Sequence, residues 1–346
     1  MNNPILEVQG LSTTFHRGGV TLPALRDVSF NVGKGEVLGL VGESGSGKSV
    51  TLRSVLGLAR RYGEVTGQVR WQGQDLTGLS EREMRHIRGR EIAMIFQEPM
   101  TSLNPLLTVG RQLTETLKAH TDLNRRARKD RAIEMLDLVG IPAAASRLSD
   151  YPHQFSGGMR QRVMIAIALA VGPQLLLADE PTTALDVTIQ AQILDLILKL
   201  SQDMDMGVIL VTHDLGVVAQ TCDRVAVMYA GRIVEQGAVR QVLKGPRHPY
   251  TVGLMQSVPE GVAPRTQLYS VPGTPPSLAA LPQGCAFAPR CAFVSGPCAA
   301  QRPELESVGE GRELACFHPV EALDGVASKA GAHPASSPHM TEESAA

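Results

Sequence analysis

Short apolar runs alternate with longer segments of helical periodicity through most of the chain. The runs predict buried strands at 5–9, 28–32, 36–41, 69–72, 92–96, 175–178, 208–211 and 225–228. Helices are expected to begin near Lys48 and to cover 187–200, and the stretch from about 108 to 172 is mainly helical. Apolar strands separated by helices are typical of a parallel sheet that helices cover. The pattern therefore predicts an α/β fold with a helical block inserted between two strands.

A glycine-rich loop joins the apolar strand at 36–41 to the helix that begins near Lys48. Its glycines let the backbone curl close to a phosphate, while successive N–H groups and the helix N-terminus supply donors and partial positive charge. Lys48 is expected to reach the β- and γ-phosphates, and Ser49 to ligate Mg²⁺. The flanking strand and helix favour a phosphate-binding loop over an ordinary glycine turn. The predicted nucleotide contacts are Gly42, Glu43, Ser44, Gly45, Ser46, Gly47, Lys48 and Ser49.

Polar residues that follow apolar strands predict the rest of the nucleotide site. Asp179 is expected to hold Mg²⁺, directly or through water, and Glu180 to polarise the attacking water as a general base. His213 follows the next strand and is predicted to contact the γ-phosphate as a hydrogen-bond donor or orienter. Gln97 ends another strand, where its amide can reach Mg²⁺ or water. Such residues at strand ends are often structural, but their order after a phosphate loop favours the chemical roles.

A second glycine turn, Phe155-Ser156-Gly157-Gly158-Met159, opens another helix and predicts a phosphate clamp offered to a partner chain. Together with the phosphate loop and the strand-end residues, it makes residues 5–320 resemble the ATPases of ABC transporters. The resemblance implies a P-loop NTPase fold with an inserted helical subdomain, and two ATP molecules sandwiched between two such domains. It also implies that Ser156, Gly157 and Gly158 contact ATP on the opposing subunit.

The same resemblance assigns further roles. Phe15 matches the aromatic residue that stacks on adenine in this family, with a core phenylalanine as the alternative. Gln97 would couple the nucleotide state to the membrane partner, and the segment 184–186 would lie along the dimer seam. The chain is expected to hydrolyse ATP because it keeps the whole catalytic set, namely Lys48, Asp179, Glu180 and His213.

Three stretches narrow the resemblance to dipeptide and oligopeptide importer ATPases: 97–105, 247–251 and a cysteine-containing appendage. Complexes of that group contain two different ATPases, two permeases and an extracytoplasmic binding protein. The resemblance therefore implies a heterodimer on the cytoplasmic face of the inner membrane. An importer of nickel or another small solute is one alternative, since nothing in an ATPase touches the cargo. A soluble ABC ATPase acting on nucleic acid or ribosomes is another, but it predicts a long coiled-coil insertion or tandem cassettes, and the sequence has neither.

Composition and charge further limit the partners and the location that we expect for the chain. The 346 residues carry a formal net charge of -1, which gives no general argument for a nucleic-acid partner, and the basic run at 125–129 is interpreted as a solvated helix face. The sequence shows no signal-peptide pattern and no apolar run long enough to cross a bilayer. We expect an ATPase domain at 1–245 with its helical subdomain at about 98–172. A proline-rich connector leads into an extension at 246–320, and a disordered tail follows at 321–346.

Four cysteines in the extension follow the spacing C-x5-C-x6-C-x17-C and suggest a shared metal. Ligation would supply cross-links that so small a region lacks. The resemblance to peptide importer ATPases favours a [4Fe-4S] cluster, while zinc, with His318 as a substitute ligand, and four reduced thiols are the alternatives. The predicted ligands are Cys285, Cys291, Cys298 and Cys316.

Overall fold

A mixed β-sheet forms the centre of the molecule in the computed structural model, which describes residues 4–97, 102–183, 185–257 and 269–320. Its strand order is β11-β12-β10-β9-β3-β8-β7-β6. The parallel strands are β3 (Val37–Val41), β6 (Ile92–Ile95), β7 (Leu175–Asp179), β8 (Gly207–Thr212) and β9 (Arg224–Tyr229). Strands β3, β7 and β8 are buried along their whole length, as expected for strands covered on both faces. The predicted α/β fold is confirmed.

An antiparallel sheet forms a second layer, with the strand order β2-β1-β4-β5. Its strands are β1 (Leu6–Arg17), β2 (Val20–Val32), β4 (Gly63–Trp71) and β5 (Gln74–Asp75). Strands β1 and β2 run well beyond the predicted 5–9 and 28–32, because register shifts between Val8 and Thr14 break the alternation of apolar and polar residues. A core between the two sheets buries one face of the antiparallel layer against the mixed sheet and α1 (Lys48–Val55).

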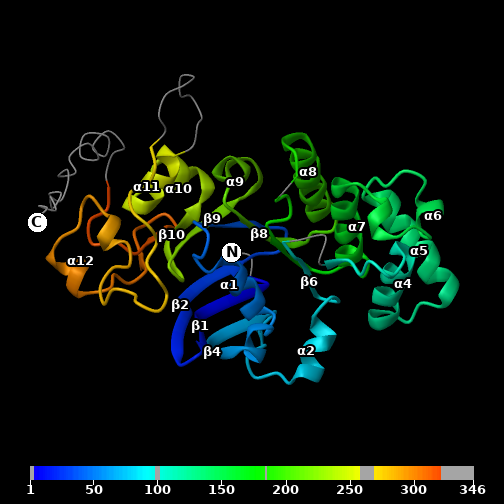
Figure 1. Cartoon of the computed structure of the whole chain (residues 1–346), viewed down its shortest axis with the longest axis horizontal. Coiled ribbons are helices and arrows are strands. Elements are labelled where there is room, and N and C mark those ends of the chain that lie inside the picture. The colour runs from blue at the N-terminus through cyan, green and yellow to red at the C-terminus, as the bar shows by residue number, and fades with distance from the viewer. Residues whose placement is uncertain (1–3, 98–101, 184, 258–268, 321–346) are drawn as a thin grey trace, which may run out of the picture.

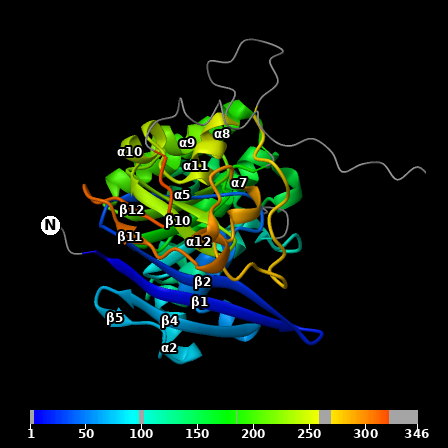
Figure 2. The same cartoon turned by 90° about the vertical axis from the view of Figure 1, so that its left-hand side faces the viewer.

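Helices cover the opposite face of the mixed sheet, so the molecule has three layers in Figure 2. This layer holds α8 (Val187–Asp203), α9 (Leu215–Thr221), α10 (Val239–Lys244) and α11 (Pro249–Gln256). The short elements α2 (Glu81–Ile87) and η1 (Ala59–Arg61) accompany the antiparallel sheet. Within the described ranges, no helix is long and apolar enough to cross a membrane.

A block of helices follows β6 in the chain and ends before β7, and it forms one end of the molecule in Figure 1. It comprises α4 (Val109–His120), α5 (Arg125–Leu138), α6 (Ala144–Arg147), η2 (Pro152–Gln154) and α7 (Gly157–Leu169). Its core is continuous with apolar residues of β6, β7 and α8, so the block is packed onto the sheet. Residues 98–101 of the predicted helical subdomain, Ala184 of the predicted dimer seam and the predicted tail at 321–346 lie outside the described residues.

The C-terminal extension forms the other end of the molecule (Figure 1) and is joined to the mixed sheet. Its short strand β12 (Glu313–Leu314) pairs with β10 (Arg232–Ala238) and with β11 (Glu306–Ser307). The helices η3 (Ala288–Arg290) and α12 (Gly296–Ala300) complete it, and the described part of the predicted proline-rich connector has no helix or strand. The sequence analysis missed β10, whose run is interrupted by buried polar residues that gain partners only in the folded chain.

One of these polar residues, Glu235, organises the start of α11. Its carboxylate is fully buried and accepts the backbone N–H groups of Arg247 and His248 at 2.9 and 3.1 Å, and it also pairs with Arg312. His248 caps α11, because its Nδ1 accepts the N–H of Tyr250 at 3.0 Å while Pro249 occupies the first turn. Burial lowers the pKa of His248 to about 3.

We predict that this histidine makes the fold sensitive to mild acid. The folded chain keeps His248 neutral down to about pH 3, whereas the unfolded chain protonates it near the ordinary value of 6.5. The unfolded state therefore binds more protons between these pH values, and the free energy of unfolding falls with falling pH by up to about 1.4 kcal/mol per unit. His248→Asn keeps a capping oxygen and should flatten that slope in urea unfolding at pH 7 and pH 5.5. An unchanged slope would contradict the assignment.

Candidate functional site

The phosphate-binding loop leaves β3 and enters α1 by a backbone path that only glycine permits. Gly42 and Gly47 have φ values of +151° and +107°. A Cβ atom on Gly42 would lie 2.2 Å from the carbonyl oxygen of Met228, and one on Gly47 would lie 2.9 Å from Leu25. The loop is therefore packed between β2 and the end of β9, and the N-terminus of α1 follows it directly. This arrangement suits an anion such as a phosphate.

Lys48 is held inside this loop. Its Nζ donates to the carbonyl oxygens of Gly42 at 2.7 Å and Glu43 at 3.1 Å, and the side chain is almost fully buried. Burial lowers the pKa of Lys48, while the carboxylates of Glu180, Asp179 and Glu43 act in the opposite direction. The neighbouring Ser46 Oγ is buried and has no hydrogen-bond partner among the described residues. The Lys48 ammonium and the Ser46 hydroxyl are therefore two buried donors available to a phosphate.

Asp179 lies at the end of β7 beside the start of α1. Its Oδ1 accepts the hydroxyl of Ser49 at 2.7 Å, and its Oδ2 is buried with no partner in the described part of the chain. Burial raises the pKa of Asp179, and the hydrogen bond from Ser49 partly opposes this rise. A buried carboxylate oxygen without a donor is a fitting ligand for a cation, and Ser49 lies beside it, so the assignment of Ser49, Asp179 and Gln97 to Mg²⁺ stays a prediction.

Glu180 joins three other polar side chains at the same edge of the sheet. Its backbone has φ +47°, and its Oε2 accepts the amide of Gln97 at 3.2 Å and the hydroxyl of Thr183 at 2.8 Å. The Nδ1 atom of His213 lies 3.6 Å from the same oxygen, and the histidine side chain is 67% exposed. The structure therefore brings Gln97, Glu180 and His213 together, as their strand-end positions predicted. Thr183 was missed, since its position three residues after Glu180 is its only signal in the sequence.

The second glycine turn and Phe15 lie on other elements, at the start of α7 and on β1. Ser156 caps α7 by accepting the N–H of Met159 at 3.3 Å, and a Cβ on Gly158 would lie 2.8 Å from Ile189 of α8. Phe15 is half-buried on β1 opposite Gly63 of β4. Nothing in a single chain tests the predicted contact of either with ATP, so both assignments stay predictions.

Two residues of the extension contact the phosphate loop, and the sequence analysis missed both contacts. Tyr250 Oη accepts the N–H of Glu43 at 2.8 Å, and the Arg290 guanidinium forms two bonds to the Glu43 carboxylate, at 2.8 and 3.0 Å. Glu43 was predicted to contact the nucleotide as part of the loop. In the structure its backbone N–H and its carboxylate are both already engaged by the extension.

The four cysteines of the extension line one small cavity, together with His248, Phe287 and His318. All four are free thiols, and burial raises the pKa of Cys291 to about 11 and of Cys316 to about 12. The cavity has a volume of about 20 Å³, enough for one water molecule. No group of three or more His, Cys, Asp or Glu side chains within the described ranges is arranged to hold a metal ion. The predicted cluster is therefore not supported by this arrangement.

Two family models match the chain. Residues 25–183 match the model described as ABC transporter, and residues 234–298 match the model described as oligopeptide/dipeptide transporter, C-terminal region. The first match covers the phosphate loop and the two acids that end β7. The second covers most of β10, α11 and the first three cysteines of the extension, and its range includes Tyr250 and Arg290.

Known proteins resemble nearly the whole chain. The oligopeptide transport ATP-binding protein OppD of Salmonella typhimurium is 48% identical over 93% of this chain and 96% of its own length. The dipeptide transport ATP-binding protein DppD of Escherichia coli is 48% identical over 92% and 97%. A solved dimeric ATP-binding cassette bound to ADP and Pi superposes with a TM-score of 0.61 at 31% identity, covering 68% of this chain and 99% of that one. The chain therefore belongs to the ABC transporter ATP-binding proteins of the oligopeptide/dipeptide importer family.

Proposed function

We propose that this chain hydrolyses ATP to power the uptake of dipeptides or oligopeptides across the cytoplasmic membrane. The observation that carries the proposal is the grouping of Lys48, Asp179, Glu180 and His213 at one edge of the sheet, in a chain whose extension matches the oligopeptide/dipeptide C-terminal region. The printed names of its relatives support peptide as cargo. We place the chain at the cytoplasmic face of the membrane, as a peripheral subunit.

Each residue of the group has a distinct role in this proposal. Ser49 and Asp179, with Gln97, would hold Mg²⁺, which would neutralise phosphate charge, and Lys48 would exchange its backbone partners for the β- and γ-phosphates. Glu180 takes the proton of the attacking water as general base, with Gln97 and Thr183 holding its Oε2. His213 donates to the γ-phosphate, and its exposed position beside Glu180 leaves it free to do so.

A second ATPase chain completes the site in this proposal. The Ser156 turn opens α7, a helix whose exposed N-terminus suits a phosphate held by the opposing subunit. Phe15 would stack on the adenine, and Leu185 and Asp186 would face the partner. The partner is a different ATPase of the same family, so two ATP molecules lie between the two chains.

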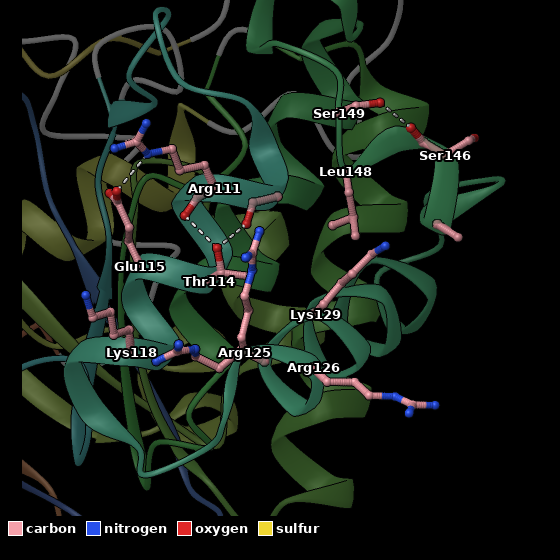
Figure 3. Close-up of a pocket in the computed structure, with 13 residues that line it drawn as sticks. Arg111, Thr114, Glu115, Lys118, Arg125, Arg126, Lys129, Ser146, Leu148 and Ser149 are labelled. Carbon is pink, nitrogen blue, oxygen red and sulfur yellow. Dashed lines mark hydrogen bonds and ion pairs between the residues drawn. The ribbon is translucent and has the colours of Figure 1, made fainter.

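The helical block offers a docking surface for the permeases. A cleft of about 1060 Å³ lies between α4, α5 and α6, and Figure 3 shows Lys129 pointing across it toward Leu148. Six of its lining side chains are basic and one is acidic, and that acid, Glu115, is already paired with Arg111. The basic residues are Arg111, Lys118, Arg125, Arg126, Arg128 and Lys129. We propose that an acidic cytoplasmic segment of a permease docks here, which gives the basic run at 125–129 a role beyond solvation.

We also propose, from the resemblance to peptide importer ATPases, that the four cysteines bind a shared [4Fe-4S] cluster, which needs more room than the present cavity of about 20 Å³. The four thiols line one cavity, and backbone N–H groups of Phe293 and His318 donate to Cys291 and Cys316 at 3.4 Å each, but the present arrangement of the described residues is not one that could hold a metal ion. The imidazole of His318 is engaged by Ser295, which makes it a weaker candidate for a zinc ligand. Four reduced thiols remain the alternative.

We predict that Glu180→Gln abolishes turnover but keeps ATP binding. Loss of the general base should lower the hydrolysis rate by roughly 10²- to 10⁴-fold, and the ATP-loaded dimer should accumulate. The variant is measured in the assembled complex with the partner's site inactivated, by phosphate release and by size-exclusion chromatography. Lys48→Ala serves as the comparison, since it should lose binding as well. Wild-type turnover by Glu180→Gln would contradict the role.

We predict that the tagged chain recovers two permeases and a second ATPase from gently solubilised membranes. Arg125→Glu combined with Lys129→Glu should reduce this recovery at least tenfold, because both changes put like charge against an acidic partner. The matched control reverses Arg82 and Arg85, exposed residues of α2 outside the cleft, and should recover the complex normally. Recovery with ribosomes or DNA would overturn the transport proposal, and normal recovery by the cleft variant would overturn the docking surface alone.

We predict that anaerobically purified chain contains iron and acid-labile sulfide. Replacing Cys285, Cys291, Cys298 and Cys316 by serine should remove the iron and the sulfide. It should also remove the visible charge-transfer absorbance of such clusters. Cys222→Ser is the matched control, because Cys222 packs against β3 and burial raises its pKa to about 12. Bound zinc in place of iron would contradict the cluster and support a zinc site. A chain without metal would contradict both the cluster and the zinc site.

A further inference from the structure

Two described residues of the extension, Tyr250 and Arg290, contact the nucleotide site at the phosphate loop. Arg290 lies 247 residues from Glu43 in the chain, yet its guanidinium bonds both oxygens of that carboxylate. Arg290 is almost fully buried, with 5% of its side chain exposed, while Glu43 is 24% exposed. A bidentate pair of this kind fixes both partners in one orientation. The contact therefore constrains the loop and does not merely cover it.

Further bonds fix Arg290 within the extension. Its Nε donates to the carbonyl oxygen of Pro272 at 2.8 Å, and its terminal nitrogens also donate to Val271 at 3.2 Å and to Tyr229 Oη at 3.3 Å. The residue ends η3 and directly precedes Cys291. The position of Arg290, and through it that of Glu43, is consequently set by residues 271–272 and by Tyr229 of β9.

A second bond holds the same loop residue from α11. Tyr250 is fully buried, and its Oη accepts the N–H of Glu43 at 2.8 Å. Its ring packs against Tyr229 and Phe287, with ring centroids 4.6 and 5.5 Å away. The backbone and the side chain of Glu43 are therefore both anchored to the extension, at the second position of a loop whose glycines at 42, 45 and 47 have positive φ.

We infer that Arg290 and Tyr250 are positioning residues that hold the phosphate loop in its ATP-binding shape, so that the C-terminal extension controls ATP affinity. Two physical effects support this. A loop with several glycines loses conformational freedom when it binds a phosphate, and anchoring it beforehand removes part of that cost. Arg290 also compensates a carboxylate that would otherwise stand unpaired beside the phosphates of ATP. The inference rests on nucleotide binding at this loop and does not depend on the cargo or on a metal in the extension.

The test compares ATP binding by full-length variants, measured as the equilibrium Kd of a fluorescent ATP analogue with Mg²⁺. Arg290→Met should raise the Kd about tenfold, which corresponds to about 1.4 kcal/mol. Adding Glu43→Gln should recover much of that loss, because it removes the unpaired charge. Tyr250→Phe, which deletes only the accepting oxygen, should raise the Kd about threefold. In the assembled complex the KM for ATP should rise in parallel, while kcat stays within about twofold of the wild type.

A matched control separates positioning from general damage to the extension. Arg232 is as buried as Arg290 and pairs with Glu304 at 3.0 Å and with Asp27 at 3.5 Å, but neither carboxylate is part of the phosphate loop. Arg232→Met should lower the stability of the chain and leave the Kd within about twofold. The inference is overturned if Arg290→Met binds ATP like the wild type, or if Arg232→Met weakens binding equally. Unchanged binding by Lys48→Ala would instead show that the analogue reports on another site, which is a failure of the nucleotide-site assignment.

Discussion

The parallel pairing of β3, β6, β7 and β8 is the constraint on which the nucleotide site depends. Parallel strands carry their carboxyl ends to one edge of the sheet, and residues far apart in the chain meet there for that reason alone. Asp179 shows the energetic consequence. One of its oxygens is buried without a donor among the described residues, which costs stability in the absence of a ligand. A cation bound at this oxygen would offset that cost, so the end of β7 is a suitable position for the proposed Mg²⁺.

The extension is part of this architecture. It enters the mixed sheet through the pairing of β10 with β12, and the buried carboxylate of Glu235 receives the start of α11. From there the aromatic cluster of Tyr229, Tyr250 and Phe287 reaches the phosphate loop. The family match to the C-terminal region begins at residue 234, inside β10, earlier than the predicted boundary at 245. The extension is therefore bonded both to the mixed sheet and to the phosphate loop.

Much of the parallel sheet and of the nucleotide site could be predicted from local sequence patterns. The strands of the parallel sheet are apolar on both faces, and Lys48, Ser49 and Asp179 sit in motifs whose spacing is set by a single turn or strand end. The antiparallel strands were predicted too short, because the register shifts near Gly10 and Leu11 interrupt the alternation that identifies a strand. Strands β11 and β12 escaped prediction because they are only two residues long, and β10 because buried polar residues interrupt its apolar run.

Long-range contacts explain what could not be predicted at the site. The His-Pro-Tyr segment was recognised through resemblance, but nothing in its composition says that the tyrosine oxygen of Tyr250 accepts the Glu43 N–H. Arg290 resembles any other arginine in a loop until folding brings it to Glu43. The four cysteines were predicted to share a site, and they do line one cavity, but its volume and the absence of a metal-ion arrangement among the described residues follow only from packing.

The most direct test of the central claim is uptake of a labelled peptide by proteoliposomes that contain this chain, its partner ATPase and the permeases, with the binding protein supplied on the opposite side. The account predicts peptide accumulation that requires ATP on the side of this chain and stops when Glu180→Gln replaces the wild type. ATP hydrolysis with no accumulation of any dipeptide or oligopeptide, or accumulation of nickel in place of peptide, would contradict it.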